Sequence, residues 1–318
     1  MLTFVPTPLG NLKDITLRSL EHLAKSQIVL CEDTRVAKSL FSKLASSLDS
    51  LFLDSALLLS ATKSATSASS LNPKSKQFIS LHSHNEQNFI STLSPEFFNA
   101  EVIYISDAGM PSICDPGAKL IQYMQSHNLP YNVLVGGCAL TVAFCFSGFI
   151  NQGFIFGGFL PHKSKERVNA LKQHASLALP SIWYESTHRI IESLGDIALH
   201  LPSVRVFAIK EISKLHQRHF IGTADEILAT LTINAKNKKN NNNVAKHSNE
   251  KKHIDNKILQ GEWVLVLEAV PSQMPSLTLY ESDIVALEIP PKIKAKLLST
   301  LTGKDTKKLY ENLTKTTN

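Results

Sequence analysis

The sequence predicts an α/β protein with two α/β domains, a cleft between them and a small helical piece at the C-terminus. Two patterns lead to this fold class. Residues 1–150 contain five short apolar runs, each followed by a helix-like segment, which is typical of a doubly wound parallel sheet. Residues 151–270 contain five further strand-like runs separated by two helical segments and short links, which favours a mixed sheet. The expected domains are therefore 1–150, 151–270 and a basic helical domain at 271–318.

Apolar and β-branched runs locate the strands. Those of the first domain are expected at 2–6, 27–31, 78–81, 102–105 and 131–135, and those of the second at 154–159, 181–184, 204–209, 218–221 and 262–268. The run 102–105 contains no charge or turn former, which suits a strand buried on both faces. After Pro290, apolar residues with lysines on the other faces indicate the C-terminal helical piece.

Two segments differ in composition from their surroundings. Residues 44–77 are rich in Ser, Ala and Leu; the leucines suit a loose amphipathic helix, and 60–70 is expected to be flexible. Residues 234–257 are rich in Asn and Lys, with four consecutive asparagines at 240–243, and cannot supply a core. We therefore expect a disordered insertion at 234–257.

The net charge of +6 is unevenly distributed. Segments 234–260 and 292–318 each contain seven lysines and two acidic residues, so each carries +5 and the rest of the chain is near −4. A polyanion such as RNA should therefore meet the protein first at one of these two segments.

Cysteine usage and hydropathy indicate a cytoplasmic protein. The four cysteines form no Cys-x-x-Cys pair and lack the spacing of a secreted scaffold. Pro6, Pro8 and Gly10 interrupt the N-terminal segment before a signal peptide could form. The stretch between Lys119 and Lys163 has no Asp, Glu, Lys or Arg, but glycines divide it into pieces too short to span a membrane. We therefore expect no membrane partner.

The ends of the predicted strands carry small and polar residues. Ser-Asp-Ala-Gly at 106–109 follows the strand 102–105, at the edge where open α/β sheets bind ligands. The sequence contains no G-x-G-x-x-G, G-x-x-x-x-G-K-[ST], H-E-x-x-H or G-x-S-x-G, which argues against nicotinamide, P-loop, protease and esterase sites. His82 and His84 lack a third ligand at a recognised spacing, so no metal is expected.

A series of motifs along the chain resembles one known family. In order they are VPTPLGNLKDIT at 5–16, EDTR at 32–35, HNE at 84–86, SDAGMP at 106–111, DPG at 115–117, GFLP at 158–161, YESTHR at 184–189 and GE at 261–262. This order is similar to the tetrapyrrole methylase family, and within it to the members that methylate ribosomal RNA. The resemblance covers residues 2–268 and extends to the C-terminal helical piece. One departure is VGG at 135–137, where the family usually has Pro-Gly-Pro or Pro-Gly-Ala.

The resemblance implies an enzyme that transfers a methyl group from S-adenosylmethionine to the ribose 2′-hydroxyl of a cytidine in 16S rRNA of the small ribosomal subunit. It also suggests a homodimer, with the cofactor folded into the cleft between the two α/β domains. The cofactor contacts that it implies are Pro8, Gly10, Ser106, Asp107, Ala108, Gly109, Pro111, Cys138, Ala139 and Tyr184. Two other functions stay open: methylation of a tetrapyrrole-like small molecule, and a catalytically silent RNA-binding module.

The ribose hydroxyl must lose its proton during methyl transfer, so a base or polarising group is needed. The candidates at predicted strand ends are Glu185, Lys210 and Glu211, and the sequence does not choose among them. The expected RNA contacts are basic residues near the motifs and on the C-terminal piece: Arg35, Lys163, Lys165, Arg167, Arg189, Lys292, Lys294, Lys296, Lys304, Lys307 and Lys308.

Overall fold

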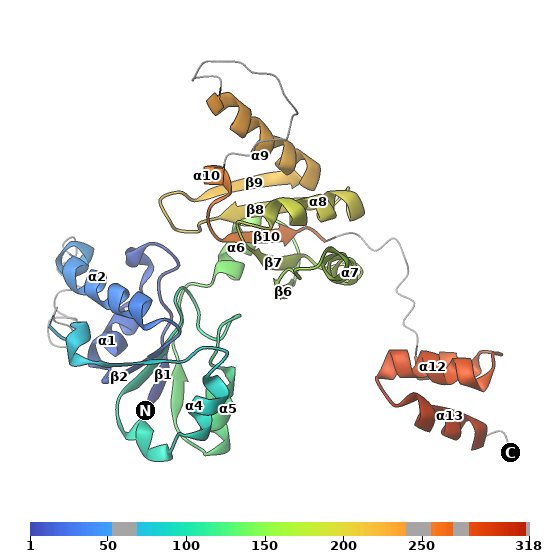
Figure 1. Cartoon of the computed structure of the whole chain (residues 1–318), viewed down its shortest axis with the longest axis horizontal. Coiled ribbons are helices and arrows are strands. Elements are labelled where there is room, and N and C mark those ends of the chain that lie inside the picture. The colour runs from blue at the N-terminus through green and yellow to red at the C-terminus, as the bar shows by residue number, and fades with distance from the viewer. Residues whose placement is uncertain (53–68, 240–255, 270–279, 316–318) are drawn as a thin grey trace. The chain divides into compact units, whose positions relative to one another are not determined.

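The computed structural model describes residues 1–52, 69–239, 256–269 and 280–315 of the 318-residue chain. Internal contacts divide the chain into two units, Met1–Val270 and Pro271–Asn318. The first unit contains two five-stranded sheets, and the second contains helices (Figure 1). The predicted fold class is confirmed.

The first sheet is entirely parallel. Its strands are β1 (Leu2–Phe4), β2 (Ile28–Cys31), β3 (Gln77–Ser80), β4 (Val102–Ile105) and β5 (Tyr131–Val133), in the spatial order β3-β2-β4-β1-β5. All neighbouring strands run in the same direction. Because parallel strands end at the same edge, the loops after β1, β2 and β4 come together there.

Both faces of this sheet are covered, because successive side chains of a strand point to opposite faces. On one face Val29 and Ile103 pack with residues of α1 (Leu17–Lys25) and α2 (Thr34–Phe52). On the other face Leu30 and Tyr104 pack with residues of α4 (Glu86–Ser91) and α5 (Ala118–Ser126). This double burial explains the uninterrupted apolar run of β4. Three 3-10 turns lie in the connections: Leu12–Asp14, Pro73–Ser75 and Pro95–Asn99.

The second sheet is mixed, as predicted. Its strands are β6 (Ile155–Phe159), β7 (Ser181–Glu185), β8 (Arg205–Lys210), β9 (Arg218–Thr223) and β10 (Trp263–Leu267), in the spatial order β6-β7-β10-β8-β9. β6 and β7 are parallel, and the other three pairings are antiparallel.

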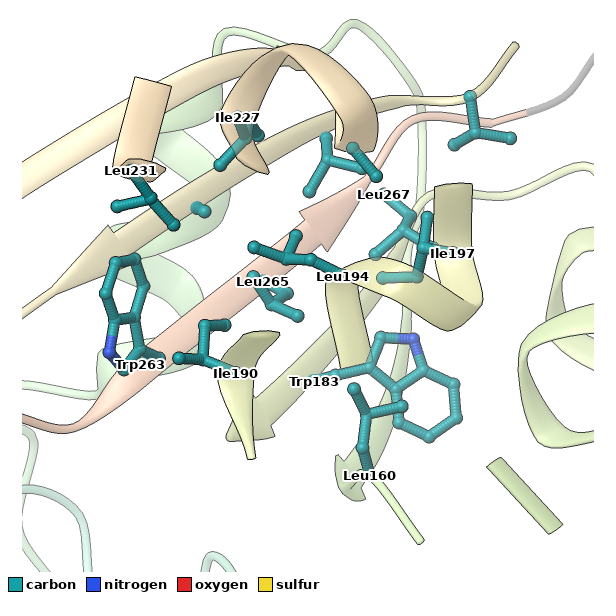
Figure 2. Packing of buried hydrophobic residues seen from close by; sticks show 14 of the residues in the cluster. Leu160, Trp183, Ile190, Leu194, Ile197, Ile227, Leu231, Trp263, Leu265 and Leu267 are labelled. Atoms are coloured by element: carbon teal, nitrogen blue, oxygen red, sulfur yellow. The ribbon is translucent and has the colours of Figure 1, made fainter. Parts of the chain in front are cut away.

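Four helices pack on one face of the second sheet: α7 (Ser164–Ala175), α8 (Ile190–His200), α9 (Ala224–Lys239) and α10 (Asn256–Leu259). Figure 2 shows the core that results, with Trp183 and Trp263 of the sheet beside Leu194 and other side chains of α8. On the opposite face lies α6 (Ala139–Ser147), whose Leu140 packs in a cluster with Phe207. α6 follows β5 of the first sheet in the chain but packs on the second sheet, so it links the two.

The second unit consists of α11 (Glu281–Ala286), α12 (Pro291–Thr302) and α13 (Thr306–Lys315). Among the described residues of this unit, the buried side chains are Ile284, Ala295 and Leu298. A core of this size leaves most of the unit's described side chains in solvent.

The two segments of unusual composition are described in part. Residues 44–52 form the end of α2, while 234–239 and 256–257 belong to α9 and α10. The prediction that all of 234–257 is disordered is therefore wrong at both ends, because α9, anchored by the buried Ile227 and Leu231, continues into the Lys-rich segment. Residues 53–68, which include most of the stretch expected to be flexible, and residues 240–255 lie outside the described residues. None of the helices in the described ranges is long and apolar enough to span a membrane.

Candidate active site

A cleft of about 740 Å³ lies between the ends of the parallel strands and the second sheet. Small-molecule sites have volumes of roughly 300–1,000 Å³, so a ligand of cofactor size fits. We call the first side the parallel-sheet wall; it contains Leu9, Glu32, Asp107, Ala108, Gly109, Met110, Ile113, Cys114 and Asp115. The mixed-sheet wall contains Phe159, Tyr184, Glu185, Ser186, Thr187, His188, Glu211, Lys214, Gly261, Glu262, Trp263 and Val264. Cys138 and Ala139, at the start of α6, lie between the two walls in the chain and also line the cleft.

The loop after β4 is fastened to the loop after β1. Thr7 and Gly109 exchange two backbone hydrogen bonds of 3.0 and 3.1 Å. The Thr7 hydroxyl donates to the Ser106 carbonyl, and the Ser106 hydroxyl donates to the Gly109 carbonyl, both at 3.2 Å. Thr7 and Ser106 are buried. These contacts hold the backbone of 106–109 at the cleft with short side chains only, which leaves room for a ligand.

The next part of this loop presents Asp115 to the cleft. Ser112 and Cys114 have left-handed backbone angles, with φ of 67° and 64°, which are strained for residues with a side chain. Gly117 has φ of 125°, and its N–H donates to Glu86 Oε1 at 2.9 Å. A side chain at Gly117 would meet the Tyr104 ring at 2.9 Å, so this position requires glycine.

Three carboxylates of the parallel-sheet wall face the cleft: Glu32, Asp107 and Asp115. Burial raises the pKa of all three, and neighbouring carboxylates raise it further: Asp107 and Asp33 act on Glu32, and Asp33 and Glu262 act on Asp107. The pKa of Asp115 rises to about 7, from burial first and then from Glu32, Asp107 and Glu262. Asp107 accepts a hydrogen bond from the Asp33 N–H at 3.3 Å, which opposes the rise. Within the described ranges, no Lys or Arg forms an ion pair with any of the three.

On the mixed-sheet wall, Glu185 is enclosed by partners. Its Oε1 accepts from Arg189 Nη2 at 2.7 Å and from the Ser186 N–H at 2.6 Å, and its Oε2 accepts from Ser193 Oγ at 2.5 Å. Its side chain is 0% exposed, and Arg189 also donates to the Leu160 carbonyl. Glu185 therefore fastens the end of β7 to α8.

Glu211 and Lys210, at the end of β8, are also engaged. Glu211 Oε1 accepts from Lys214 Nζ at 3.0 Å and from the Glu262 N–H at 3.2 Å. Burial acts to raise the pKa of Glu211, but these hydrogen bonds hold it below its usual value. Lys210 Nζ donates to the Gln260 carbonyl at 2.7 Å and lies 5.9 Å from the centre of the Trp263 ring. Burial lowers the pKa of Lys210.

The structure places most of the predicted cofactor residues at the cleft. Those that line it are Asp107, Ala108, Gly109, Cys138, Ala139 and Tyr184. Pro8, Gly10, Ser106 and Pro111 are not among its lining residues. Ser106 supports the loop from behind, through the hydrogen bonds described above. Of the predicted catalytic candidates, Glu185 and Glu211 line the cleft and Lys210 does not.

Sequence reasoning left out several residues of the site. Glu32, Asp115 and Glu262 lie at the cleft, although the motifs that contain them were recognised. Lys214, which pairs with Glu211 and Glu262, belongs to none of the motifs. The signal available in the sequence was a charged residue directly after a strand, and Glu32 satisfies it.

The VGG sequence at 135–137 keeps the loop after β5 close to the loop after β1. A side chain at Gly136 would lie 2.3 Å from Pro6 Cβ, so the close approach of the two backbones requires glycine there. Gly137 has a more open environment. Val135 is 80% exposed, so the position where the family usually has proline makes little contact with the described core.

Two of the predicted RNA contacts have little exposed side-chain surface and are paired with carboxylates. Arg167 is buried at 2% exposure, pairs with Asp196 at 2.6 Å and donates to the Pro161 and His162 carbonyls. The expectation of an exposed Arg167 is therefore wrong, because the helical period turns this residue of α7 towards α8. Arg189 is 14% exposed and is held by Glu185.

The other predicted RNA contacts differ in whether their charged groups already form ion pairs or hydrogen bonds within the protein. Arg35, Lys163 and Lys304 are exposed but form ion pairs with Asp33, Glu166 and Glu281. Lys294 donates to the Val285 carbonyl. In the part of the chain that the structure describes, no hydrogen bond or ion pair engages the exposed ammonium groups of Lys165, Lys292, Lys296, Lys307 and Lys308.

A metal-binding arrangement is not found among the described side chains, where no three His, Cys, Asp or Glu residues are placed to hold an ion. The rings of His82 and His84 are 5.9 Å apart and meet edge to face. This pair therefore packs together rather than facing a common point.

Comparison with known proteins identifies the family. Residues 1–228 match the family model for tetrapyrrole (corrin/porphyrin) methylases. The chain belongs to the tetrapyrrole methylase family. This match covers β1 to β9, and so most of both walls of the cleft. The family predicted from the ordered motifs is confirmed, and with it the methyltransferase class.

Relatives within the family are similar along almost the whole chain. A ribosomal RNA small subunit methyltransferase I of Helicobacter pylori strain J99 is 41% identical over 317 residues, which are 98% of this chain and 96% of that protein. Proteins of the same name from Campylobacter fetus and Neisseria meningitidis serogroup A are 36% and 30% identical, over 98% of this chain and 99% and 91% of theirs. Among solved structures, a cobalt precorrin-4 methyltransferase aligns with 13% identity and a TM-score of 0.49, over 83% of this chain and 93% of that one.

The cleft suits the methyl donor that was predicted from the resemblance. S-adenosylmethionine carries a sulfonium and an ammonium group, and carboxylates without cation partners complement such charges. The nine-residue helix α6 begins at the cleft, and its Cys138 side chain forms no cap hydrogen bond. Its first N–H groups can therefore donate hydrogen bonds to an amino-acid carboxylate. The carboxylates and the start of α6 thus fit the positive groups and the carboxylate of the methionine moiety.

Proposed function

We propose that this tetrapyrrole methylase transfers a methyl group from S-adenosylmethionine to the ribose 2′-hydroxyl of a cytidine in 16S rRNA of the small ribosomal subunit. The observation that supports this most is the similarity to ribosomal RNA small subunit methyltransferase I over 96% of the length of that relative. The cleft with its unpaired carboxylates supports it independently. We place the enzyme in the cytoplasm, where its substrate would be found.

The parallel-sheet wall binds the cofactor in this proposal. Asp107 accepts from the ammonium group, the start of α6 receives the carboxylate, and the backbone of 106–109 lies along the methionine moiety. Tyr184, whose ring packs 5.0 Å from Phe156, forms an apolar surface on the other side. When bound, S-adenosylmethionine supplies an electrophilic methyl group. The chain has to align the ribose oxygen with that methyl carbon and accept a proton.

The mixed-sheet wall positions the ribose. We assign Glu185 and Glu211 as positioning residues, because the partners that hold them also shape this wall. Lys210 supports Trp263 and the carbonyl of Gln260 from behind. The hydrogen-bond network of Glu185 fixes the 184–189 motif, which includes the lining residues Tyr184 and His188.

The second unit contributes to RNA binding in this proposal. Lys292 and Lys296 on α12 and Lys307 and Lys308 on α13 are exposed and carry positive charge without described partners. Phosphate contacts of this kind dominate nucleic-acid affinity and weaken steeply with salt. Arg35, Lys163 and Lys165 provide basic side chains on the first unit.

Labelled S-adenosylmethionine tests the reaction directly. Purified protein should transfer label to small ribosomal subunits or 16S rRNA, and a ribose-methylation map of rRNA with and without the gene should differ at one cytidine. Label in a porphyrinoid and none in RNA would support the small-molecule alternative instead. RNA binding without any cofactor binding by calorimetry would support the silent RNA-binding module.

Truncation after Pro290 tests whether the second unit contributes to RNA binding. We expect cofactor affinity to stay nearly unchanged and RNA affinity to fall. The slope of log affinity against log salt should flatten by about 0.7–0.9 for each phosphate that the shortened protein no longer neutralises. A Lys163→Ala/Lys165→Ala variant, which leaves the buried Arg167 intact, is the matched control on the first unit. An unchanged salt slope in the truncated protein would contradict a role of the second unit.

We also propose a homodimer that uses the outer face of α6. Phe146 is 48% exposed although its ring lies 5.0 Å from His219, and Cys145 and Thr141 beside it are exposed. Ile221, paired with Phe207 in the sheet register, is 50% exposed on the same face. Sedimentation should show a dimer that Phe146→Asp shifts to monomer, while Leu199→Asp on α8 has no such effect. A wild-type monomer would contradict this proposal.

A further inference from the structure

The carboxylate of Asp115 lies in the cleft without a partner. Among the described residues no hydrogen bond or ion pair engages it, whereas Glu185, Glu211 and Lys210 are all held by partners. A group that must accept a proton from a substrate needs a free acceptor oxygen at the cleft. Given the function proposed above, on which this inference rests, we propose that Asp115 is the catalytic residue that takes the proton of the ribose hydroxyl.

The loop that carries Asp115 is built to hold it in place. Pro111 is buried and Pro116 follows Asp115 directly, and both restrict the backbone. The left-handed angles of Ser112 and Cys114 cost free energy, and strained positions of this kind persist where the surrounding structure enforces them. The Ser112 hydroxyl and the Gly117 N–H tie the two ends of the turn to the Pro116 carbonyl and to Glu86. The carboxylate is therefore presented on a short side chain from a fixed backbone.

The surroundings of Asp115 favour its protonated form. Acidic groups face it from three other parts of the chain: Glu32 after β2, Asp107 after β4 and Glu262 before β10. Cys114, the Tyr104 hydroxyl and the Tyr184 hydroxyl are further titratable neighbours. The Tyr104 hydroxyl is buried and has no hydrogen-bond partner in the described structure. Lys214, the one lysine or arginine among the described residues that line the cleft, forms ion pairs with Glu211 and Glu262.

The chemistry of the step balances with Asp115 as acceptor. The ribose 2′-oxygen forms a bond to the methyl carbon as the carbon–sulfur bond breaks, and the electron pair of that bond stays on sulfur. The hydroxyl proton moves to an Asp115 carboxylate oxygen and leaves to water after product release. A base whose pKa lies near the working pH is both largely deprotonated and able to hold the proton.

The first test is the pH profile of single-turnover methyl transfer. In the wild type the rate should fall tenfold per pH unit below a pKa at or somewhat under 7, because a bound cation lowers the pKa of Asp115. Asp115→Asn should lose about 100-fold or more in rate and also lose this limb of the profile. Glu32→Gln is the matched variant: removal of a neighbouring negative charge should move the limb to lower pH without abolishing it.

Two measurements do not depend on activity. Carbon-13 NMR of labelled aspartate carboxyls in the protein without ligand should show one group titrating near pH 7, absent in Asp115→Asn and shifted down in Glu32→Gln. Calorimetry should show that Asp115→Asn binds S-adenosylmethionine within about tenfold of the wild type. The inference is overturned if Asp115→Asn transfers methyl groups at a rate within tenfold of the wild type. It is also overturned if Asp115→Asn loses rate only because it no longer binds S-adenosylmethionine. A wild type that methylates no RNA overturns the proposed function, while the NMR titration still reports on Asp115.

Discussion

The two walls of the cleft carry similar numbers of acidic side chains but differ in whether cationic side chains pair with them. On the mixed-sheet wall, Glu185 is paired with Arg189 and hydrogen-bonded to Ser193, and Glu211 is paired with Lys214. On the parallel-sheet wall, Glu32, Asp107 and Asp115 have no cation among the described residues. Glu32 and Asp115 are partly buried and Asp107 is exposed at the cleft. A partly desolvated charge without a partner is unfavourable, so a fold retains several such charges side by side only where something else compensates. The difference identifies the parallel-sheet wall as the one that receives a cationic ligand.

The largest expected effect tests whether the mixed-sheet wall is structural. Glu185→Ala leaves the Arg189 guanidinium, which is 14% exposed, without its carboxylate. Removing one partner of such a buried pair costs about 3–5 kcal/mol of unfolding free energy. Chemical denaturation measures this. Glu166→Ala, which removes the exposed pair with Lys163, should cost about 1 kcal/mol or less. Equal losses of unfolding free energy for the two variants would contradict a structural role of Glu185 on the mixed-sheet wall.

The next effect concerns the loop that carries Asp115. Gly117→Ala places a Cβ 2.9 Å from the Tyr104 ring and 3.0 Å from the Phe4 ring, at a backbone angle that alanine disfavours. We expect a loss of about 2–3 kcal/mol, from backbone strain and overpacking together. Gly148→Ala has the strain without the contacts, since nothing lies within 4 Å of the added atom, and should cost about 1 kcal/mol. Denaturation midpoints of the two variants should therefore differ. If they coincide, contact with Tyr104 and Phe4 does not restrain the loop.

Asp107→Ala tests whether the parallel-sheet wall binds S-adenosylmethionine. Asp107 accepts one 3.3 Å hydrogen bond and otherwise faces the cleft, so its loss should leave the fold intact. One charge-assisted hydrogen bond to the ammonium group is worth about 1.5–3 kcal/mol, so S-adenosylmethionine affinity should fall about tenfold or more in calorimetry. Glu96→Ala, on the exposed Pro95–Asn99 turn, serves as the control. Unchanged affinity would remove Asp107 from the site.

The smallest effect is the pH dependence of stability. Because the pKa of Asp115 in the folded protein is about 7, above that of the unfolded chain, its ionisation destabilises the fold as pH rises from about 4 to 7. Asp115→Asn should therefore stabilise the protein at pH 8 by on the order of 1 kcal/mol, after discounting for solvent screening, and have little effect at pH 4. That corresponds to a rise of about 2–4 °C in Tm at pH 8. A stabilisation that is the same at both pH values would mean that the charge of Asp115 is not responsible.

Much of the fold followed from local patterns. The strand at 102–105 and the alternation of strand and helix before residue 150 were visible as runs of apolar residues. Between residues 151 and 270 the sequence predicted two helical segments, whereas the described residues there form four helices, α7 to α10. The site was predicted less completely. The motif at 115–117 was recognised, but nothing in its three letters distinguishes Asp115 from an ordinary turn residue, because the missing partner is a property of residues far away in the chain. The prediction that Arg167 is exposed was wrong for the same reason, because its partner Asp196 lies 29 positions later in the chain.

The sequence by itself determined the two-sheet architecture, the methyltransferase family and the loops that meet at the cleft, because hydrophobic period and motif order are encoded in neighbouring residues. The tertiary structure decided which charges are neutralised and which are left free. Glu185 and Asp115 are both acidic residues at cleft loops, yet α8 brings Arg189 and Ser193 to the first, while Glu32 and Asp107 are brought to the second. Burial and charge pairing depend on contacts between distant segments, so the chemical character of each carboxylate emerges only when the two sheets are folded together.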